Sequence, residues 1–373
     1  MDNFSVSNQK KLGFGLMRLP KKGDEIDIEQ TCIMVDKFLE AGFTYFDTAW
    51  AYNGSEEAMR KALIERHPRE NYTVATKLAA WIKCETREDA IAQFTTSLER
   101  SGAGYFDYYL LHNLGEHRTK FYDDFGMWDF VKEKKAEGLI RHIGISFHDK
   151  ADVLEPILQA HPEIEFVQLQ INYADWESPR VQSRLCYEMC RKYDKPVVIM
   201  EPVKGGKLAD PPEEVKALMK AYAPDASFAS WAIRFAASLD GVLTVLSGMS
   251  NEAQMRDNLS FMADFKPLNA EERDIIRRSQ EIMDQSGAIQ CTGCGYCLEG
   301  CPLSIPISEV FEAANLHLVS GQTQQGKEKY AQATQGKGRA GECVGCKNCE
   351  SVCPQHLEIT QHLKTAASLF DHA

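Results

Sequence analysis

The sequence predicts an α/β protein in which a (β/α)₈ barrel, the TIM-barrel fold, precedes a small, mostly helical domain rich in cysteine. Two observations lead to this prediction. Short apolar runs alternate with amphipathic helical stretches over roughly 250 residues, and two identical cysteine spacings follow them. The apolar runs, each with the composition of a buried strand, cover residues 12–17, 43–48, 72–77, 105–112, 139–146, 165–172, 196–201 and 241–248.

The stretches between these runs have helical patterns. Apolar residues recur at helical spacing in residues 29–42 and 87–102, and a glycine ends each stretch. The alternative architecture is a doubly wound open sheet, which carries a glycine-rich dinucleotide-binding loop after its first strand. Residues 13–15 read Gly-Phe-Gly, which is too short for that loop, so the barrel is favoured.

The composition excludes several classes of partner. The chain has 373 residues, 44% of them hydrophobic and 26% charged, as in ordinary globular proteins. Its net charge of −12 argues against nucleic acids and anionic membrane surfaces, because both attract clustered lysine and arginine. No apolar run approaches the length of a membrane span, and residues 1–11 lack the apolar segment of a signal peptide. We therefore expect a cytoplasmic protein.

The composition changes near Gly287. Before it, a charged helical stretch begins at Asn269, which has the spacing of a capping box with Glu272. After it, two cysteine loops flank a helix-like segment, residues 308–321, and a polar stretch, residues 322–341. The sequence thus predicts a barrel domain over residues 1–286 and a second domain over residues 287–373.

Eight of the 12 cysteines lie in two copies of the pattern C-x-x-C-x-x-C-x-x-x-C-P. Three thiolates at this spacing can bind three irons of one [4Fe–4S] cluster, and the fourth cysteine, before the proline, binds the other cluster. Zinc would need neither the third cysteine nor the proline, and disulfides would need an oxidising compartment. We therefore expect two [4Fe–4S] clusters, one held by Cys291, Cys294, Cys297 and Cys353, and the other by Cys343, Cys346, Cys349 and Cys301.

The cysteine pattern resembles the ferredoxin domain family. Residues 302–342, which separate the two loops, are more numerous than in the compact bacterial two-cluster form, and the arrangement is more similar to the helical ferredoxin variant. The cysteines outside the loops are expected to be buried or half-buried thiols; these are Cys32, Cys84, Cys186 and Cys190.

Polar residues stand at the carboxyl ends of several predicted strands. Asp47, Lys77 and His112 stand at strand ends, and Tyr52 follows Asp47 on the next loop. Active sites of such barrels lie at the carboxyl ends of the strands, so we expect these side chains to meet there. A phenol titrates at about 10 and is a poor acid at neutral pH, but a neighbouring ammonium favours the phenolate.

These four residue types have the chemistry for carbonyl reduction. Asp47 would keep Lys77 charged, and Tyr52 would donate a proton to the carbonyl oxygen. His112 would hydrogen-bond the same oxygen and orient the substrate. Taken singly, each residue has an ordinary structural explanation as a cap, an ion pair or a core residue; taken together, the four indicate a catalytic group.

The segments that carry these residues resemble the aldo/keto reductases. The matching sequences are FDTAWAYNGSEEAMRKAL (46–63), VATK (74–77), YYLLH (108–112) and GLIRHIGIS (138–146). The resemblance covers Leu12 to Asn258, and it implies that Asp47, Tyr52, Lys77 and His112 form the catalytic tetrad with Tyr52 as general acid. The whole chain is similar to aldo/keto reductases that carry a C-terminal 4Fe–4S domain.

The resemblance also implies a nicotinamide cofactor, NADP or NAD, across the barrel mouth. It would be held by the first loop, by the residues that bind the carboxamide, by the pyrophosphate loop and by the adenine end. The matching residues are, in that order, Gly15, Met17 and Arg18; Ser146 and Gln168; Lys204, Gly205 and Gly206; and Gly248, Ser250, Gln254 and Asn258.

Two departures from the family pattern lie near the nicotinamide position. Phe147 stands where the family often has an asparagine beside the carboxamide-binding serine. Glu201 stands where an aromatic ring often stacks on the nicotinamide. A carboxylate near a reducible ring weakens the expectation of NADPH.

A third departure lies at the adenine end. Gly248 and Gln254 stand where a lysine and an arginine often bind the 2′-phosphate. The loss of two cations predicts NADH over NADPH, or a different redox cofactor such as a flavin. Compensation by Arg256 or Lys204 would restore NADPH, and the sequence leaves this choice open.

Two functions from different classes follow. The first is an oxidoreductase that reduces a small carbonyl or quinone-like substrate with electrons from NAD(P)H or from the clusters. The clusters would serve a ferredoxin-like electron partner, sense the redox state or stabilise their own domain. The second is a redox-sensing or electron-transfer module that binds a nucleotide or flavin without carbonyl turnover. The intact tetrad favours the first, because a sensor needs no acidic tyrosine. The loop over residues 114–128 fits a sugar, a quinone or a small ketone equally, so the substrate stays open.

Overall fold

The computed structural model describes residues 10–285 and 287–371. Its contacts divide the chain into two compact units. The first unit runs to Val203 and resumes over Asp225–Arg273, and the second contains Lys204–Pro224 and the chain from Asp274 onward. The domain boundary near Gly287 stays a prediction.

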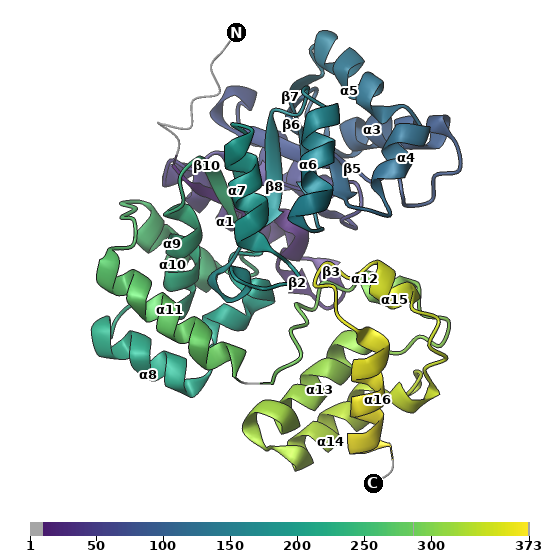
Figure 1. The fold of residues 1–373 in the computed structure, drawn as a ribbon. Coiled ribbons are helices and arrows are strands. Elements are labelled where there is room, and N and C mark those ends of the chain that lie inside the picture. The colour runs from purple at the N-terminus through teal and green to yellow at the C-terminus, as the bar shows by residue number, and fades with distance from the viewer. Residues whose placement is uncertain (1–9, 286, 372–373) are drawn as a thin grey trace. The chain divides into compact units, whose positions relative to one another are not determined.

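The first unit is a closed barrel of eight parallel strands (Figure 1). Each strand pairs with its neighbours in chain order, and the barrel closes where the last strand pairs with the first, with Val245 beside Leu12. The predicted (β/α)₈ fold is therefore confirmed, with a strand in each of the eight apolar runs. The strands are β1 (Leu12–Gly15), β4 (Tyr45–Asp47), β5 (Thr73–Leu78), β6 (Phe106–Leu114), β7 (Ile140–Phe147), β8 (Phe166–Gln170), β9 (Val197–Met200) and β10 (Val242–Ser247).

Helices follow the strands, and their ends agree with local sequence signals. The Asp27 carboxylate accepts a hydrogen bond from the Gln30 backbone at the start of α1, and Thr86 and Asp89 form a capping box before α3. Gly102 ends α3 in a left-handed conformation, which glycine adopts without strain. The helices of this unit are α1 (Ile28–Glu40), α2 (Ser55–Met59), α3 (Arg87–Ser101), α4 (Thr119–Asp124), α5 (Met127–Ala136), α6 (Ala151–Ala160), α7 (Ser183–Lys192), α9 (Phe228–Ala237) and α10 (Glu252–Met262).

Side chains from alternate strand positions fill the barrel interior. Gly144 on β7 makes room there, because a Cβ at this position would lie 2.4 Å from the Phe166 ring. The barrel is therefore a packed core below its mouth. The residues of this interior cluster are Tyr45, Ala75, Tyr108, Leu110, Phe166, Val198, Leu243 and Leu246.

A short hairpin precedes α1. Its strands are β2 (Lys21–Lys22) and β3 (Glu25–Ile26), and Gly23 occupies the turn at a φ of 64°. Two-residue strands are too short to show an apolar alternation, so the sequence pattern does not predict them.

The second unit is mostly helical, as predicted. Its helices α13 (Ile307–Ser320), α14 (Thr323–Ala333) and α16 (Ile359–Phe370) pack side by side around a small apolar core (Figure 1). The helix α11 (Ala270–Asp284) begins in the first unit with the predicted capping box of Asn269 and Glu272 and ends in the second. The remaining helices are α8 (Glu213–Tyr222), α12 (Tyr296–Glu299) and α15 (Asn348–Ser351).

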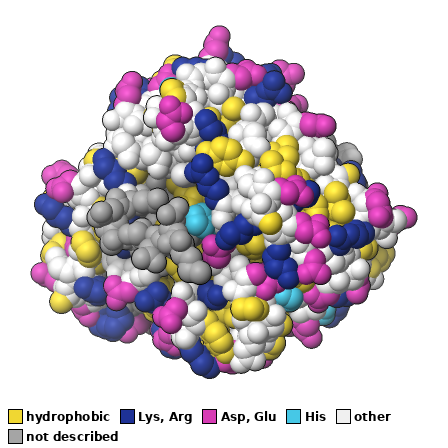
Figure 2. Space-filling model, turned by 90° about the horizontal axis from the view of Figure 1, so that it is seen from above, with side chains coloured by type: hydrophobic (Ala, Val, Ile, Leu, Met, Phe, Trp, Pro, Cys, Tyr) yellow, Lys and Arg dark blue, Asp and Glu magenta, His cyan; other side chains and the backbone are white. Residues whose placement is uncertain are grey.

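The surface carries both signs of charge. Figure 2 shows acidic and basic side chains interspersed over the face in view. Within residues 10–285 and 287–371, the helices are all too short or too polar to cross a lipid bilayer.

Candidate active site

Three of the four predicted catalytic residues lie on neighbouring strands. Asp47 ends β4, Lys77 lies near the end of β5 and His112 lies near the end of β6. All three side chains are buried, and Tyr52, on the loop between β4 and α2, is half-buried. Because β4, β5 and β6 are adjacent and parallel, their carboxyl ends bring these residues together at one end of the barrel.

Lys77 and Asp47 form a buried ion pair. The Lys77 Nζ lies 2.6 Å from Asp47 Oδ1 and donates a second hydrogen bond to the Thr48 carbonyl at 2.7 Å. Burial lowers the pKa of Lys77 and raises the pKa of Asp47, and the attraction between the two groups opposes both shifts. The Lys77 Nζ also lies 5.1 Å from the centre of the Tyr52 ring, so the pair is placed beside the phenol.

His112 faces the same phenol. Its ring lies 5.9 Å from the Tyr52 ring, centre to centre, at an interplanar angle of 84°. Burial, together with the charge of Lys77, holds the pKa of His112 well below its usual value, so the imidazole is neutral at pH 7. His112 Nδ1 is buried and has no hydrogen-bond partner in the described part of the chain.

Three further residues, which the strand-end pattern does not predict, fix this end of β6. Trp81 donates a hydrogen bond from Nε1 to the His112 carbonyl at 3.1 Å, and the Tyr122 hydroxyl donates to the same carbonyl. The Arg118 guanidinium lies 4.5 Å above the Trp81 ring. Arg118 and Tyr122 belong to the polar, aromatic segment over residues 114–128, which the sequence predicts as a loop and which forms α4 over Thr119–Asp124. That composition is the signal that could have revealed them.

One residue matched to the first cofactor loop, Arg18, forms an ion pair with Glu201, the residue after β9. Arg18 Nη2 lies 3.4 Å from Glu201 Oε1, so the unusual carboxylate at position 201 is partly neutralised. Met17 is exposed, and a Cβ at Gly248 would lie 3.8 Å from the Arg18 Cβ. Gly248 therefore borders the Arg18 side chain, and Gly15 lies beside the Ser247–Gly248 backbone.

The residues matched to the carboxamide position are adjacent. Ser146 and Gln168 are register partners on β7 and β8, and Ser146 Oγ accepts a hydrogen bond from the Asn113 backbone at 2.7 Å. Gln168 Oε1 and Asn113 Nδ2 are buried and have no hydrogen-bond partner within the described residues. Phe147, one residue after Ser146, packs in the main core instead.

The residues matched to the adenine end form hydrogen bonds with residues just before α10 and at the end of β10. Gln254 Oε1 accepts from the Ser250 backbone at 2.7 Å, and Asn251 caps α10 by accepting from the Gln254 backbone. Asn258 Nδ2 donates to Ser247 Oγ at 2.7 Å. Gln254 therefore supplies a neutral amide at the N-terminus of α10.

Within the second unit, Gly205 of the glycine pair matched to the pyrophosphate loop lies against the first cysteine loop. Gly205 and Gly206 have φ values of 65° and 97°, and a Cβ at Gly205 would lie 2.3 Å from the Thr292 carbonyl oxygen. Lys204, which precedes them, is buried. The close approach that requires glycine at position 205 is therefore to the protein chain.

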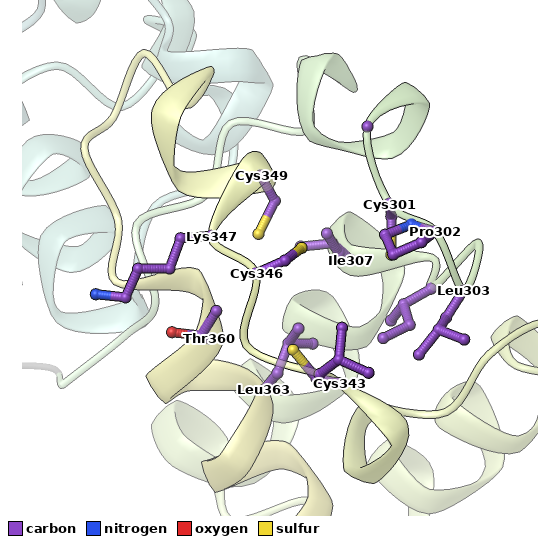
Figure 3. Close-up of a pocket in the computed structure, with 13 residues that line it drawn as sticks. Cys301, Pro302, Leu303, Ile307, Cys343, Cys346, Lys347, Cys349, Thr360 and Leu363 are labelled. Atoms are coloured by element: carbon purple, nitrogen blue, oxygen red, sulfur yellow. The ribbon is translucent and has the colours of Figure 1, made fainter.

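The eight loop cysteines line two cavities in the second unit. Each cavity gathers the four cysteines that the spacing assigns to one cluster, three from one loop and the last from the other. One cavity is lined by Cys291, Cys294, Cys297 and Cys353, and the other by Cys301, Cys343, Cys346 and Cys349 (Figure 3). Outside the loops, Cys186 and Cys190 are buried and Cys32 and Cys84 are half-buried.

Comparison with known proteins identifies the family. Residues 11–281 match the model of the aldo/keto reductase family, and residues 287–357 match that of the 4Fe-4S dicluster domain. The chain belongs to the aldo/keto reductase family, and it is an oxidoreductase with a C-terminal 4Fe–4S domain.

Individual relatives match a little over half of the chain. An aldo-keto reductase of Mycolicibacterium smegmatis is 31% identical over 229 residues, which are 60% of this chain and 74% of the relative. The 9,11-endoperoxide prostaglandin H2 reductase of Trypanosoma cruzi is 28% identical over 53% of this chain and 64% of its own length.

Solved structures show the same fold. The aldo-keto reductase AKR11C1 of Bacillus halodurans, in its holo form, has a TM-score of 0.58 and 26% identity, over 72% of this chain and 91% of that one. An aldo-keto reductase of Klebsiella pneumoniae in complex with NADPH has a TM-score of 0.58 at 20% identity, over 72% of this chain and 90% of its own.

Proposed function

We propose that the chain reduces a small carbonyl or quinone-like compound with Tyr52 as proton donor and a nicotinamide as hydride donor. We also propose that its second domain holds two [4Fe–4S] clusters that transfer electrons. The observation that carries the first proposal is the buried ion pair of Lys77 and Asp47 beside the Tyr52 ring. An ammonium in that place stabilises the phenolate that remains after proton donation.

Each member of the tetrad then has one task. Tyr52 gives its hydroxyl proton to the carbonyl oxygen, and Lys77 stabilises the resulting phenolate. Asp47 holds Lys77 in place and offsets the cost of burying its charge. His112, as a neutral imidazole, hydrogen-bonds the substrate oxygen. The nicotinamide, when bound, supplies the hydride.

Two unpartnered amide atoms near Ser146 support a nicotinamide carboxamide beside this serine. A carboxamide has an N–H donor and a carbonyl acceptor, which complement Gln168 Oε1 and Asn113 Nδ2, both buried and without hydrogen-bond partners in the described residues. Asn113 supplies the amide that the sequence lacks at Phe147. Ser146, Gln168 and Asn113 would therefore hold the carboxamide.

The choice between NADH and NADPH depends on the start of α10. NADPH is bound by the Klebsiella pneumoniae relative, but in this chain Gln254 offers an amide where a cation would bind the 2′-phosphate. We therefore propose that NADH serves as a donor as well as NADPH, because Gln254 leaves the 2′-phosphate without a cation at this position.

Gln254→Arg is expected to tighten NADPH binding about tenfold, because a charge-assisted hydrogen bond contributes about 1.5–3 kcal/mol and part of this is spent on ordering the side chain. The affinity for NADH, which lacks the 2′-phosphate, should change little. Equilibrium titration of both nucleotides against the wild type and the variant measures this. Equal changes for the two nucleotides would show that position 254 does not face the 2′-phosphate.

The clusters require a one-electron partner. A hydride carries two electrons and a [4Fe–4S] cluster exchanges one at a time, so a flavin usually mediates between them. We propose a ferredoxin-like protein as the one-electron partner. A flavin bound in the barrel would convert between the two-electron hydride and the single electrons of the clusters.

An anaerobic titration tests the proposed function against a nucleotide-binding sensor. Pure protein is mixed with NADH or NADPH and a panel of aldehydes, ketones and quinones, and both nucleotide oxidation and cluster bleaching are followed by absorbance. We expect turnover with at least one substrate and separate absorption peaks if a flavin is bound. Tight nucleotide binding without turnover across the panel would favour the sensor.

A further inference from the structure

One buried amide nitrogen in the second unit, Gln355 Nε2, belongs to the lining of a cysteine-lined cavity and has no hydrogen-bond partner among the described residues. Gln355, two residues after Cys353, lines the cavity that also contains Cys291, Cys294 and Cys297. Its side chain is only 3% exposed, and its Nε2 has no partner in the part of the chain that the structure describes. A buried N–H donor without an acceptor is costly, so a missing acceptor in the cavity is the simplest explanation.

The other cavity lacks this donor. The two loops follow the same pattern, and Leu303 stands two residues after Cys301 as Gln355 stands two residues after Cys353. Leu303 lines the second cavity, next to Cys301 (Figure 3). At equivalent positions, one cavity therefore contains an amide and the other an apolar side chain.

We propose that Gln355 Nε2 donates a hydrogen bond to a sulfur of the cluster in its cavity and thereby raises the reduction potential of that cluster. Reduction adds negative charge to the cluster, so an N–H donor stabilises the reduced form more than the oxidised form. Leu303 gives the second cluster no such stabilisation. This inference rests on the proposed assignment of two [4Fe–4S] clusters.

Other polar groups also face the cavities. Thr292 and Ser308 line the first, and Lys347 and Thr360 line the second. The Lys347 side chain is 70% exposed and lies 3.7 Å from a Glu350 carboxylate oxygen, so solvent and its partner screen its charge. These groups affect which cluster has the higher potential, but replacing Gln355 isolates the contribution of its amide.

The test is a redox titration of the full-length, cluster-loaded protein, monitored by electron paramagnetic resonance. Gln355→Leu should shift the equilibrium of one of the two reduction steps about tenfold toward the oxidised form, which for one electron lowers its reduction potential by about 59 mV. The potential of the other step should stay unchanged. Leu303→Gln should raise the reduction potential of the other cluster. Gln361→Leu, at an exposed position on α16, is the matched control and should move neither.

The possible failures are distinguishable. Fewer than two clusters in the wild type would refute the cluster assignment of the proposed function. Two clusters whose potentials are the same in the wild type and in Gln355→Leu would overturn this inference alone. If Gln355→Leu loses iron, Gln355→Met replaces it in the redox titration. Methionine keeps the length of the side chain but lacks the donor, so the same shift is expected.

Discussion

Lys77→Met is expected to lower the kcat of carbonyl reduction by about 100- to 10,000-fold, the range that general acid catalysis contributes. The substitution removes the ammonium that lies 5.1 Å from the Tyr52 ring centre, and with it the stabilisation of the phenolate. Nucleotide affinity should change little, because the residues proposed to contact the cofactor are untouched. Steady-state turnover and fluorescence titration of the nucleotide measure the two effects separately.

The same change leaves Asp47 buried without its partner, which costs about 3–5 kcal/mol of stability. The double variant Lys77→Met with Asp47→Asn removes both charges and should restore much of the folding stability without restoring activity. Recovery of turnover in the double variant would show that the loss in the single variant came from unfolding. Near-wild-type turnover of a folded Lys77→Met protein would refute the role of Lys77.

Cys294→Ser is expected to reduce the iron content from about eight to about four per chain, since each cluster needs four thiolates. The second unit should lose stability as well, because its apolar core is small and packs directly against the loop cysteines. The barrel has a separate core and should keep its secondary structure. Iron analysis, absorbance and circular dichroism during thermal unfolding measure these effects.

Cys32→Ser provides the matched control, because Cys32 is a half-buried thiol in α1, outside both cavities. It should retain the full iron content and the wild-type unfolding profile. If Cys294→Ser unfolds the barrel together with the second unit, the division into separately stable domains is wrong. Unchanged iron content in Cys294→Ser would remove Cys294 from the ligand set.

The sequence was sufficient to predict the barrel and the place of Asp47, Lys77 and His112 at neighbouring strand ends. In β6 all nine residues are buried, as strands covered on both faces are, and this gives the continuous apolar run that marks a parallel strand. Asp47, Lys77 and His112 interrupt such runs near their carboxyl ends. A charged or polar residue at the end of a buried strand is conspicuous, and the barrel topology then places the three together.

Long-range contacts were not predictable in the same way. Nothing local to residues 204–224 shows that they group with the cysteine-rich unit, or that Gly205 approaches the Thr292 carbonyl. Asn113 was missed because its placement beside Ser146 depends on the pairing of β6 with β7 and on a left-handed backbone at position 113. Such features arise from packing between distant segments, which periodicity does not encode.

Single-turnover hydride transfer in Tyr52→Phe tests the proton-donor assignment most directly. Nucleotide-loaded protein is mixed with a carbonyl substrate of the wild type, and nicotinamide oxidation is followed in time. We predict a rate at least about 100-fold below that of the wild type, with nucleotide affinity retained, because phenylalanine keeps the ring but has no proton to donate. A rate equal to that of the wild type would contradict the account.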